Sequence, residues 1–265
     1  MINSLLRPIL ERIPENNRLE RIWKLAQVDF KKRYYNDKLG LFWALLNPLF
    51  KIAIYYMVFT YVMDRGRENF AIFLFAGLLI FMAFTEAAGK GLTIIQSKKY
   101  LLENIQFNKI DLFLSSTISV FLGFAFNLVA YTFFLFGAGI EVGNNFFYLP
   151  ILLVNIFILC LGTSLILATI QIYLKDIKHL WAIIVIATFW SSGIFFPAEA
   201  ILEKFPEAVY INPLIGIIDN MRQITMENSS PNISFIIINY ITSIVFFIIG
   251  LYTFKKFSHK AIELM

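Results

Sequence analysis

The sequence predicts an all-α membrane protein with six transmembrane helices. Hydrophobic residues make up 58% of the 265 residues and charged residues only 15%, whereas soluble domains average about 45–50% and about 25%. Six long apolar runs follow one another along the chain, and they lack the alternation with a period of two that a barrel strand requires. Because lipid offers backbone polar groups no other partner, such runs are expected to cross the membrane as helices.

The first predicted element is an amphipathic helix in the stretch before the first apolar run, and it is expected to lie at the membrane surface. At about 100° per residue, the apolar and aromatic side chains fall on one arc, opposite Lys24 and Lys31, with Val28 as the exception. The arc consists of Ile22, Trp23, Ala26, Phe30 and Tyr34. Basic side chains on the polar face are expected to meet anionic headgroups, at about 1 kcal/mol each.

The six apolar runs follow this helix, and each is long enough to cross a bilayer, the fifth only just. They cover residues 39–63, 70–90, 111–138, 146–173, 180–197 and 233–254. The third and fourth are long enough to tilt or to extend beyond the bilayer. The chain therefore divides into a cytoplasmic segment (1–38), a transmembrane domain (39–255) and a cytoplasmic tail (256–265).

The distribution of basic residues predicts the orientation of the helices. Most of the 23 Lys and Arg residues fall in segments on the same side as the N-terminus. The other side carries only Arg65, Arg67, Lys204 and Arg222. Since loops rich in Lys and Arg stay in the cytoplasm, both termini are expected there. The net charge of +5 then reflects membrane asymmetry and does not suggest a nucleic-acid partner.

The longest outer segment, residues 197–232, contains two short amphipathic runs, AEAILEKF and NPLIGIIDNMRQITM. Asn212-Pro213 begins the second run, and proline favours a first helical turn. Two interpretations remain open, a pair of surface helices on the outer leaflet and a cap over a pore exit.

Two cytoplasmic connections carry mixed charge. Between the second and third runs, a short amphipathic helix is expected from Lys98, Lys99, Tyr100, Leu101, Leu102 and Glu103. Between the fourth and fifth runs, the charges are Lys175, Asp176 and Lys178. The simpler interpretation is a pair of solvated turns that carry positive-inside charges. The alternative is a docking surface for a cytoplasmic partner.

Catalytic motifs are nearly absent from the sequence. It contains neither a phosphate-binding G-x-x-x-x-G-K-[ST] loop nor a G-x-S-x-G nucleophile motif. His179 and His259 lie far apart and have no array of ligands around them, so neither a metal site nor a catalytic residue is expected. Glu86 and Lys90, four residues apart in an apolar run, are expected to form an ion pair rather than a proton relay.

The first and fifth runs carry polar and aromatic side chains that are candidates for lining a path. Asn47 and Lys51 are four residues apart and form a polar stripe on the first run. The aromatic candidates are Trp43, Phe50, Tyr55, Phe189, Trp190, Phe195 and Phe196. Aromatic faces stack on sugar rings without requiring one orientation, although packing against lipid explains most aromatic residues in such runs.

Several motifs resemble those of type-2 ABC exporter permeases that move polysaccharides. The stretch RIWKLAQVDFKKRYYNDKLGLFWALLNPLF is similar to the opening of that family, although Val28-Asp29 replaces the usual Arg-Asp. The matching residues are Lys31, Arg33, Tyr34, Leu39, Gly40, Trp43, Ala44 and Pro48. IYLKDIKHL, in which Lys175 replaces the usual Arg, and FFPAEAI with INPLIGIIDNMRQ resemble later family motifs in the same order. The likeness extends over residues 20–255.

The resemblance implies a homodimer in the bacterial inner membrane, with each subunit docked on an ATPase that another polypeptide supplies. ATP and Mg would then bind to that partner, and this chain would need no cofactor. Residues 97–108 would form the coupling helix, residues 197–228 would form re-entrant outer helices, and the first and fifth spans would line the path. Arg33 and Tyr34 would lie at its entrance, where Arg33 would meet membrane headgroups or a cargo diphosphate.

The cargo that the resemblance implies is a lipid-linked polysaccharide such as O antigen. The same architecture could instead export teichoic acid, capsule or a small amphiphilic drug or lipid. An integral-membrane enzyme acting on a lipid-linked sugar would need an acidic catalytic cluster, and the sequence has no D-x-D motif. A secondary transporter would need inverted-repeat halves and more buried charge than the sequence offers.

Overall fold

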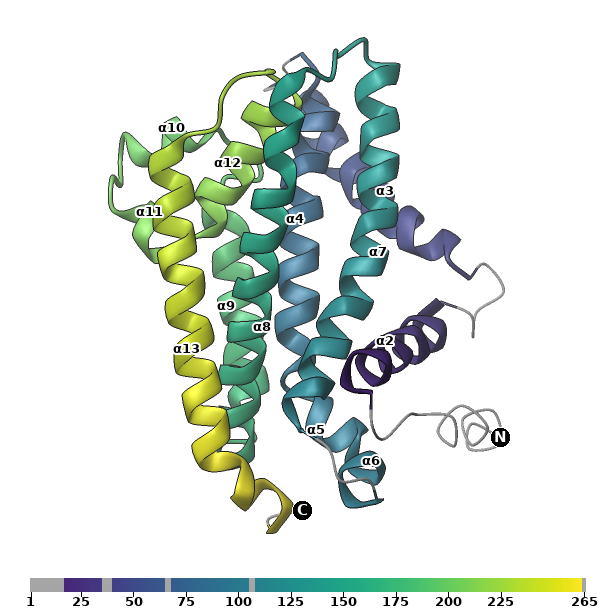
Figure 1. Ribbon diagram of the computed structural model, residues 1–265. Coiled ribbons are helices and arrows are strands. Elements are labelled where there is room, and N and C mark those ends of the chain that lie inside the picture. The colour runs from purple at the N-terminus through teal and green to yellow at the C-terminus, as the bar shows by residue number, and fades with distance from the viewer. Residues whose placement is uncertain (1–16, 35–39, 65–67, 105–107, 264–265) are drawn as a thin grey trace.

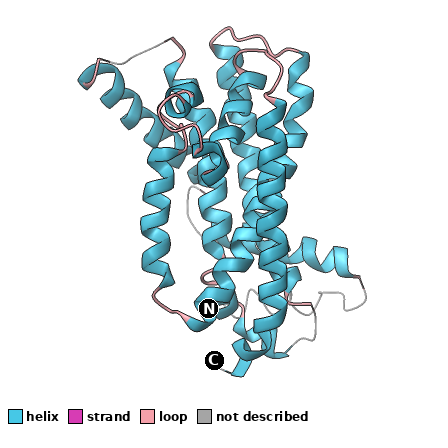
Figure 2. Cartoon of the chain, turned by 90° about the vertical axis from the view of Figure 1, so that its left-hand side faces the viewer, coloured by secondary structure: helices cyan, strands magenta, loops and turns pink. Residues whose placement is uncertain are grey.

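The computed structural model describes residues 17–34, 40–64, 68–104 and 108–263, which form a bundle of long helices (Figure 1). These described residues contain helices and loops but no strand, as the perpendicular view in Figure 2 also shows. Within the described part of the chain, five helices are long and apolar enough to cross a membrane, and a sixth apolar helix is shorter. The prediction of an all-α membrane protein is therefore confirmed.

The long helices follow the predicted apolar runs. They are α3 (Phe42–Met57), which continues as the π-helix η1 (Val58–Val62), α4 (Phe70–Lys90), α7 (Ile110–Gly137), α8 (Leu149–Tyr173), α9 (Ile177–Ser191) and α13 (Ile233–Glu263). The 3₁₀-helix η2 (Asn144–Tyr148) precedes α8. α4 is buried over most of its length and contacts α3, α7 and α8, so it forms the centre of the bundle. α13 continues through most of the predicted tail.

The fifth apolar helix ends earlier than the sequence suggests. The predicted span covered residues 180–197, but α9 has 15 residues and ends at Ser191. At about 1.5 Å per residue, it is shorter than the roughly 30 Å hydrocarbon core of a bilayer. Gly193 adopts a φ of +75°, the left-handed conformation with which helices commonly end. The Asn212 side chain donates a hydrogen bond of 2.9 Å to Ser192 Oγ and holds this turn in place.

The amphipathic helix α2 (Arg18–Tyr34) lies across the lower half of the bundle and packs against α7 (Figure 1). Its buried face differs from the predicted arc. Leu25 and Val28 are buried, whereas the side chain of Trp23 is 46% exposed. Ile22, Ala26 and Tyr34 of the arc are buried, so the arc matches the buried face in part, and contact with α7 adds side chains to that face that helical periodicity alone did not assign. Residues 1–16 and 35–39, including parts of the predicted N-terminal segment, lie outside the described residues.

Short helices occupy the two ends of the bundle (Figure 1). One end carries α5 (Ile94–Ser97) and α6 (Lys99–Asn104), and the expected coupling segment, residues 97–108, begins at the last residue of α5 and includes α6, while residues 105–107 lie outside the described residues. The other end carries α10 (Ala198–Leu202), α11 (Ala208–Ile211) and α12 (Leu214–Thr225). α12 is buried on nearly all sides and packs against α4, α8 and α13. The interpretation of this run as a surface helix is therefore wrong, while its role as a cap stays a prediction.

Candidate functional site

A cavity of about 220 Å³ lies where α2, α3, α4 and α7 meet. Four residues from the predicted path, on two different helices, line it: Arg33, Tyr34, Trp43 and Asn47. Glu86 of α4 and Asn127 of α7 contribute further polar groups. The structure thus brings together residues that the sequence placed at the entrance of the path and in the first span.

Pro48 shapes the wall that α3 contributes. It lies inside the helix, has no backbone N–H, and so leaves the carbonyl of Ala44 one turn earlier without its usual donor. Ala44 and Pro48 are both buried and both line the cavity. The freed carbonyl therefore lies on the helix segment that borders a polar cavity, where helical membrane proteins tolerate such groups.

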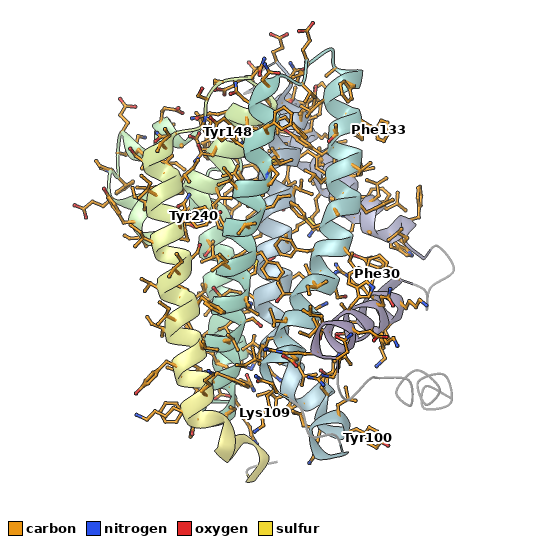
Figure 3. All side chains as sticks on the ribbon, in the orientation of Figure 1. Phe30, Tyr100, Lys109, Phe133, Tyr148 and Tyr240 are labelled. Atoms are coloured by element: carbon orange, nitrogen blue, oxygen red, sulfur yellow. The ribbon has the colours of Figure 1, made fainter. Side chains whose placement is uncertain are left out.

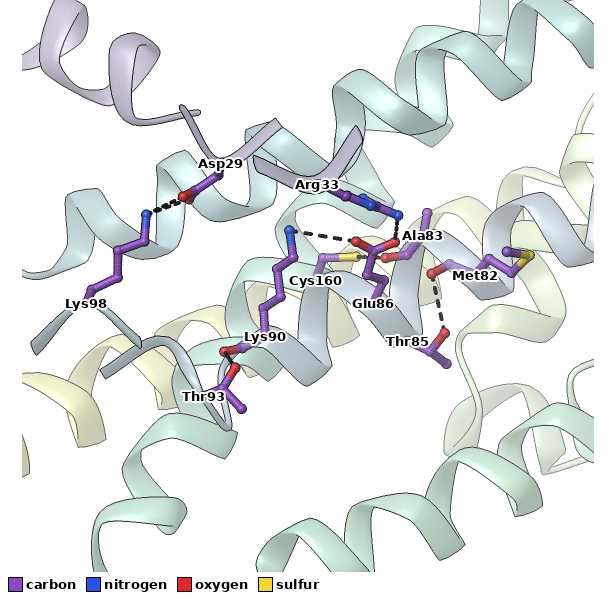
Figure 4. Close-up of polar contacts among 10 residues, drawn as sticks. All are labelled: Asp29, Arg33, Met82, Ala83, Thr85, Glu86, Lys90, Thr93, Lys98 and Cys160. Atoms are coloured by element: carbon purple, nitrogen blue, oxygen red, sulfur yellow. Dashed lines mark hydrogen bonds and ion pairs between the residues drawn. The ribbon is translucent and has the colours of Figure 1, made fainter. Parts of the chain in front are cut away.

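The Arg33 guanidinium forms an ion pair with Glu86 at the edge of this cavity (Figure 4). Lys90 Nζ lies 3.7 Å from the other oxygen of the same carboxylate, which confirms the predicted Glu86–Lys90 pair. The side chains of all three residues are about 30% exposed. One carboxylate is therefore shared by two cations, an arrangement that the sequence alone did not predict for Arg33.

Two polar atoms at the cavity are buried and have no hydrogen-bond partner within the described part of the chain. They are Arg33 Nη1, a donor, and Asn127 Oδ1, an acceptor. Buried polar groups are usually paired, and leaving one unpaired costs about 1–3 kcal/mol. The cavity therefore offers a ligand one charged donor and one neutral acceptor, next to the aromatic side chains of Tyr34 and Trp43.

Tyr34 holds the end of α2 against α7. Its side chain is buried, and burial raises the pKa of its hydroxyl to about 12, so the hydroxyl is neutral at physiological pH. A Cβ atom added at Gly123 would lie 2.5 Å from Tyr34 Oη. The glycine thus leaves space for the tyrosine, and Phe30, with its ring centre 4.9 Å away, packs on the other side.

A second cavity of about 360 Å³ shares Arg33 and Glu86 with the first. Charged and hydroxyl-bearing side chains line it, among them Asp29, Lys32, Lys90, Thr93 and Lys98. Burial lowers the pKa of Lys32, and the nearby positive charge of Lys98 lowers it further. The Arg33–Glu86 pair therefore separates a charged compartment from one lined by aromatic and amide groups.

Further ion pairs fix α2 to the bundle, and the sequence predicted none of them. Arg18 Nε and Arg21 Nη2 each lie 2.9 Å from the carboxylate of Asp111, which is fully buried in α7. Lys98 Nζ lies 2.5 Å and 2.6 Å from the two carboxylate oxygens of Asp29 (Figure 4). For Asp29, the sequence feature that could have drawn attention to the residue is its place in the opening family motif.

The predicted aromatic path residues of the fifth span form a separate cluster. Phe195 is buried, and its ring stacks on that of Phe59 at 4.8 Å and meets the edge of the Tyr55 ring at 5.1 Å. Phe189 and Trp190 also pack against Phe195. The ring of Phe196 contacts the ring of Phe59. Phe50 is 60% exposed, and neither Phe50 nor Lys51 lines either of the two cavities described above. Whether these side chains line a path stays a prediction.

The predicted coupling segment forms α6 and the end of α5. Tyr100 is 66% exposed and points away from the bundle (Figure 3), whereas Leu101 is buried in a small core with Leu25 of α2. Lys99 and Leu102 are half-buried, and the side chain of Glu103 lies outside the described residues. The other predicted coupling residues, Lys175, Asp176 and Lys178, are exposed at the start of α9.

Arg222 of α12 is a buried cation that the sequence did not single out. Its guanidinium donates to the carbonyl oxygens of Gly193 at 2.7 Å, Ile194 at 2.9 Å and Phe73 at 3.0 Å. It also lies over the Phe73 ring, with Cζ 3.2 Å from the ring centre. This one side chain thus joins α12, the turn after α9 and the first turn of α4.

The sequence also has similarity to known proteins over most of its length. Residues 20–226 match the sequence model of the ABC-2 type transporter family. An O-antigen export system permease protein RfbA of Klebsiella pneumoniae is 27% identical over 242 residues, which cover 91% of this chain and 93% of that protein. RfbA of Myxococcus xanthus is 24% identical, covering 78% of this chain and 81% of the relative. The polysialic acid transport protein KpsM of Escherichia coli is 23% identical, covering 75% and 78%. The chain belongs to the ABC-2 type transporter family.

Proposed function

We propose that this chain is the transmembrane subunit of an ATP-driven exporter. It moves a lipid-linked, O-antigen-like polysaccharide from the cytoplasmic to the outer side of a bacterial inner membrane. Family membership supports a transport subunit rather than an enzyme. The names of the relatives support a polysaccharide cargo, since they are O-antigen export permeases and a polysialic acid transport protein.

The proposed complex is a homodimer of this chain with two cytoplasmic ATPase subunits. ATP and Mg bind to those subunits, while α6 and the start of α9 supply the docking surface. Both termini of this chain face the cytoplasm, in agreement with the excess of Lys and Arg on that side. In this orientation, the Arg33 cavity opens near the inner leaflet.

The observation that carries the proposal is the Arg33–Glu86 pair at the edge of the cavity. A guanidinium binds phosphate oxygens strongly and in a fixed geometry. The diphosphate of a lipid-linked glycan would replace Glu86 as the partner of Arg33, and Lys90 would keep the carboxylate neutralised. Tyr34, Trp43 and the amides of Asn47 and Asn127 would contact the first sugars.

The cargo distinguishes this proposal from its nearest alternatives. A teichoic acid or capsule exporter would use the same architecture, and a polysialic acid transport protein is among the relatives. A drug or small-lipid exporter has less support, because the relatives named above are polysaccharide transport proteins. An enzyme acting on a lipid-linked sugar has no support from a family of transporters.

Deletion of this protein tests the proposal. Lipid-linked glycan should accumulate inside the cells, and the wild-type chain should restore export. Normal surface glycan and no accumulation in the deletion strain would reject the proposed function. Accumulation of another lipid-linked polymer would instead assign one of the alternative cargoes.

A further inference from the structure

Two ion pairs on one face of α2 connect the coupling segment with the substrate cavity. Asp29 and Arg33 are four residues apart, so they lie on the same side of the helix, about 6 Å apart along its axis. Asp29 binds Lys98, between α5 and α6, and Arg33 binds Glu86, near the end of α4. Figure 4 shows both pairs, and because Glu86 lies in α4 and Lys98 directly before α6, the two pairs tie α2 to both ends of the connection between α4 and α6.

The connection has a fixed point at its start. A Cβ atom added at Gly91 would lie 2.2 Å from the carbonyl oxygen of Ser164, so the end of α4 lies directly against the backbone of α8. Beyond Gly91 the chain forms turns and the four-residue helix α5 before it reaches Lys98. We expect a movement of α6 relative to the bundle to be taken up between Gly91 and Lys98, in the connection that the two ion pairs of α2 bracket.

The other end of α2 is anchored more firmly. Asp111 is fully buried, and it accepts from both Arg18 and Arg21. Breaking a buried ion pair by losing one partner is strongly unfavourable, because the remaining charge stays buried. The first turn of α2 is therefore fixed on α7 by ion pairs, whereas the last turn, which carries Arg33, contacts α7 through the packing of Tyr34 against Gly123, so a displacement at Asp29 acts on the last turn.

We propose that Asp29 and Lys98 are positioning residues that transmit movement of α6 to Arg33 at the cavity. The inference rests on the proposed function, in which the ATPase docks at α6. Displacement of Lys98 draws Asp29 with it and moves Arg33 away from Glu86. Lys90, 3.7 Å from the Glu86 carboxylate, then remains as the partner of Glu86. The Arg33 guanidinium turns to the diphosphate of the cargo in the cavity.

The burial of the two pairs supports this order of events. The side chains of Asp29 and Lys98 are only 12% exposed, whereas those of Arg33 and Glu86 are about 30% exposed. Solvent screens exposed pairs more strongly and weakens them. The Asp29–Lys98 contact is therefore the one that holds under displacement, and the Arg33–Glu86 contact is the one that separates.

Charge exchange in the assembled exporter tests the inference. Asp29→Asn is compared with Glu20→Gln, a matched control on the same helix, where Glu20 pairs with half-buried Lys24 of α2. ATPase co-purification, ATP hydrolysis and export of lipid-linked glycan are measured in each variant. Asp29→Asn should lower export per ATP hydrolysed about tenfold, the effect of losing a charge-assisted contact, while assembly and hydrolysis are retained. Glu20→Gln should match the wild type.

The exchanged pair gives the decisive comparison. Lys98→Asp alone should lower export, and Asp29→Lys with Lys98→Asp should recover it to within about threefold of the wild type. Wild-type export in Asp29→Asn, or an exchanged pair no better than the single variants, would overturn the inference. Failure of the wild-type chain to bind the ATPase or to export glycan would instead reject the proposed function.

A cross-link provides a second test that does not depend on charge. Cys160 is the only cysteine of the sequence and is fully buried, so a small, membrane-permeant cross-linker should react first with cysteines placed at positions 29 and 98, whose native side chains are 12% exposed. The double-cysteine variant lacks the ion pair and should export less than the wild type, whereas a short, reducible thiol cross-linker between the two cysteines should raise export again, because it makes the two positions move together. Loss of export that reductant restores would contradict the proposed transmission.

Discussion

Arg222→Gln should detach the turn after α9 from α4 and α12. The native guanidinium is 3% exposed and makes hydrogen bonds of 2.7–3.0 Å to three different carbonyl groups. Glutamine is shorter, carries no charge and cannot reach all three. Buried carbonyl groups left without a donor cost about 1–3 kcal/mol each, and such losses do not simply add, so we expect about 3–5 kcal/mol in all.

Thermal unfolding in detergent and hydrogen exchange together measure this effect. A loss of this size corresponds to about 10 °C in the midpoint of unfolding. Amides between Gly193 and Asn212 should exchange faster, because the turn loses its attachment to α4 and α12. Arg222→Lys should fall in between, since an ammonium keeps the charge but lacks the planar fork. Lys204→Gln, which removes an exposed cation of the same segment, should change neither measurement. An unchanged midpoint and unchanged exchange in Arg222→Gln would refute the reasoning.

Three further predictions concern the Arg33 cavity and helix α12. Arg33→Ala should reduce glycan export at least about tenfold while membrane insertion and ATPase assembly persist, and loss of assembly would count against a role in cargo binding. Gly123→Ala should push Tyr34 away from α7, because the new Cβ would lie 2.5 Å from its hydroxyl; a lower unfolding midpoint checks this, and an unchanged one would contradict it. Burial, together with the charge of Glu199, raises the pKa of Asp219 to about 6 from 3.8. The native state then holds this proton more tightly than the unfolded state, so stability should fall by about 3 kcal/mol as the pH rises from about 4 to above 6. Asp219→Asn should remove that fall, and an equal pH dependence in both proteins, measured by thermal unfolding, would argue against it.

The long helices were predictable because their signal is local. About 20 consecutive apolar residues specify a span whatever the rest of the chain does. The end of α9 was less predictable, because Ser191 to Phe196 remain apolar enough to continue a span. Gly193 permits the turn, and contacts from Asn212 and Arg222, which follow much later in the chain, hold it.

The candidate site was only partly predictable for the same reason. Arg33, Tyr34, Trp43 and Asn47 lie within one stretch, so a family motif could bring them to attention together. The motif could not identify Glu86 and Asn127, which line the same cavity, because these residues lie on other helices far along the chain. The links of Asp29 to Lys98 and of Arg21 to Asp111 join residues 69 and 90 positions apart.

The central claim is that this chain moves a lipid-linked polysaccharide outward when its partner hydrolyses ATP. Inside-out vesicles that contain the permease, its ATPase and labelled lipid-linked glycan measure this directly. We predict that ATP transfers the glycan from the outside of these vesicles, where a glycosidase can reach it, to the protected interior. Arg33→Ala vesicles should transfer about tenfold less. Glycan that stays equally accessible to the glycosidase with and without ATP would contradict the claim.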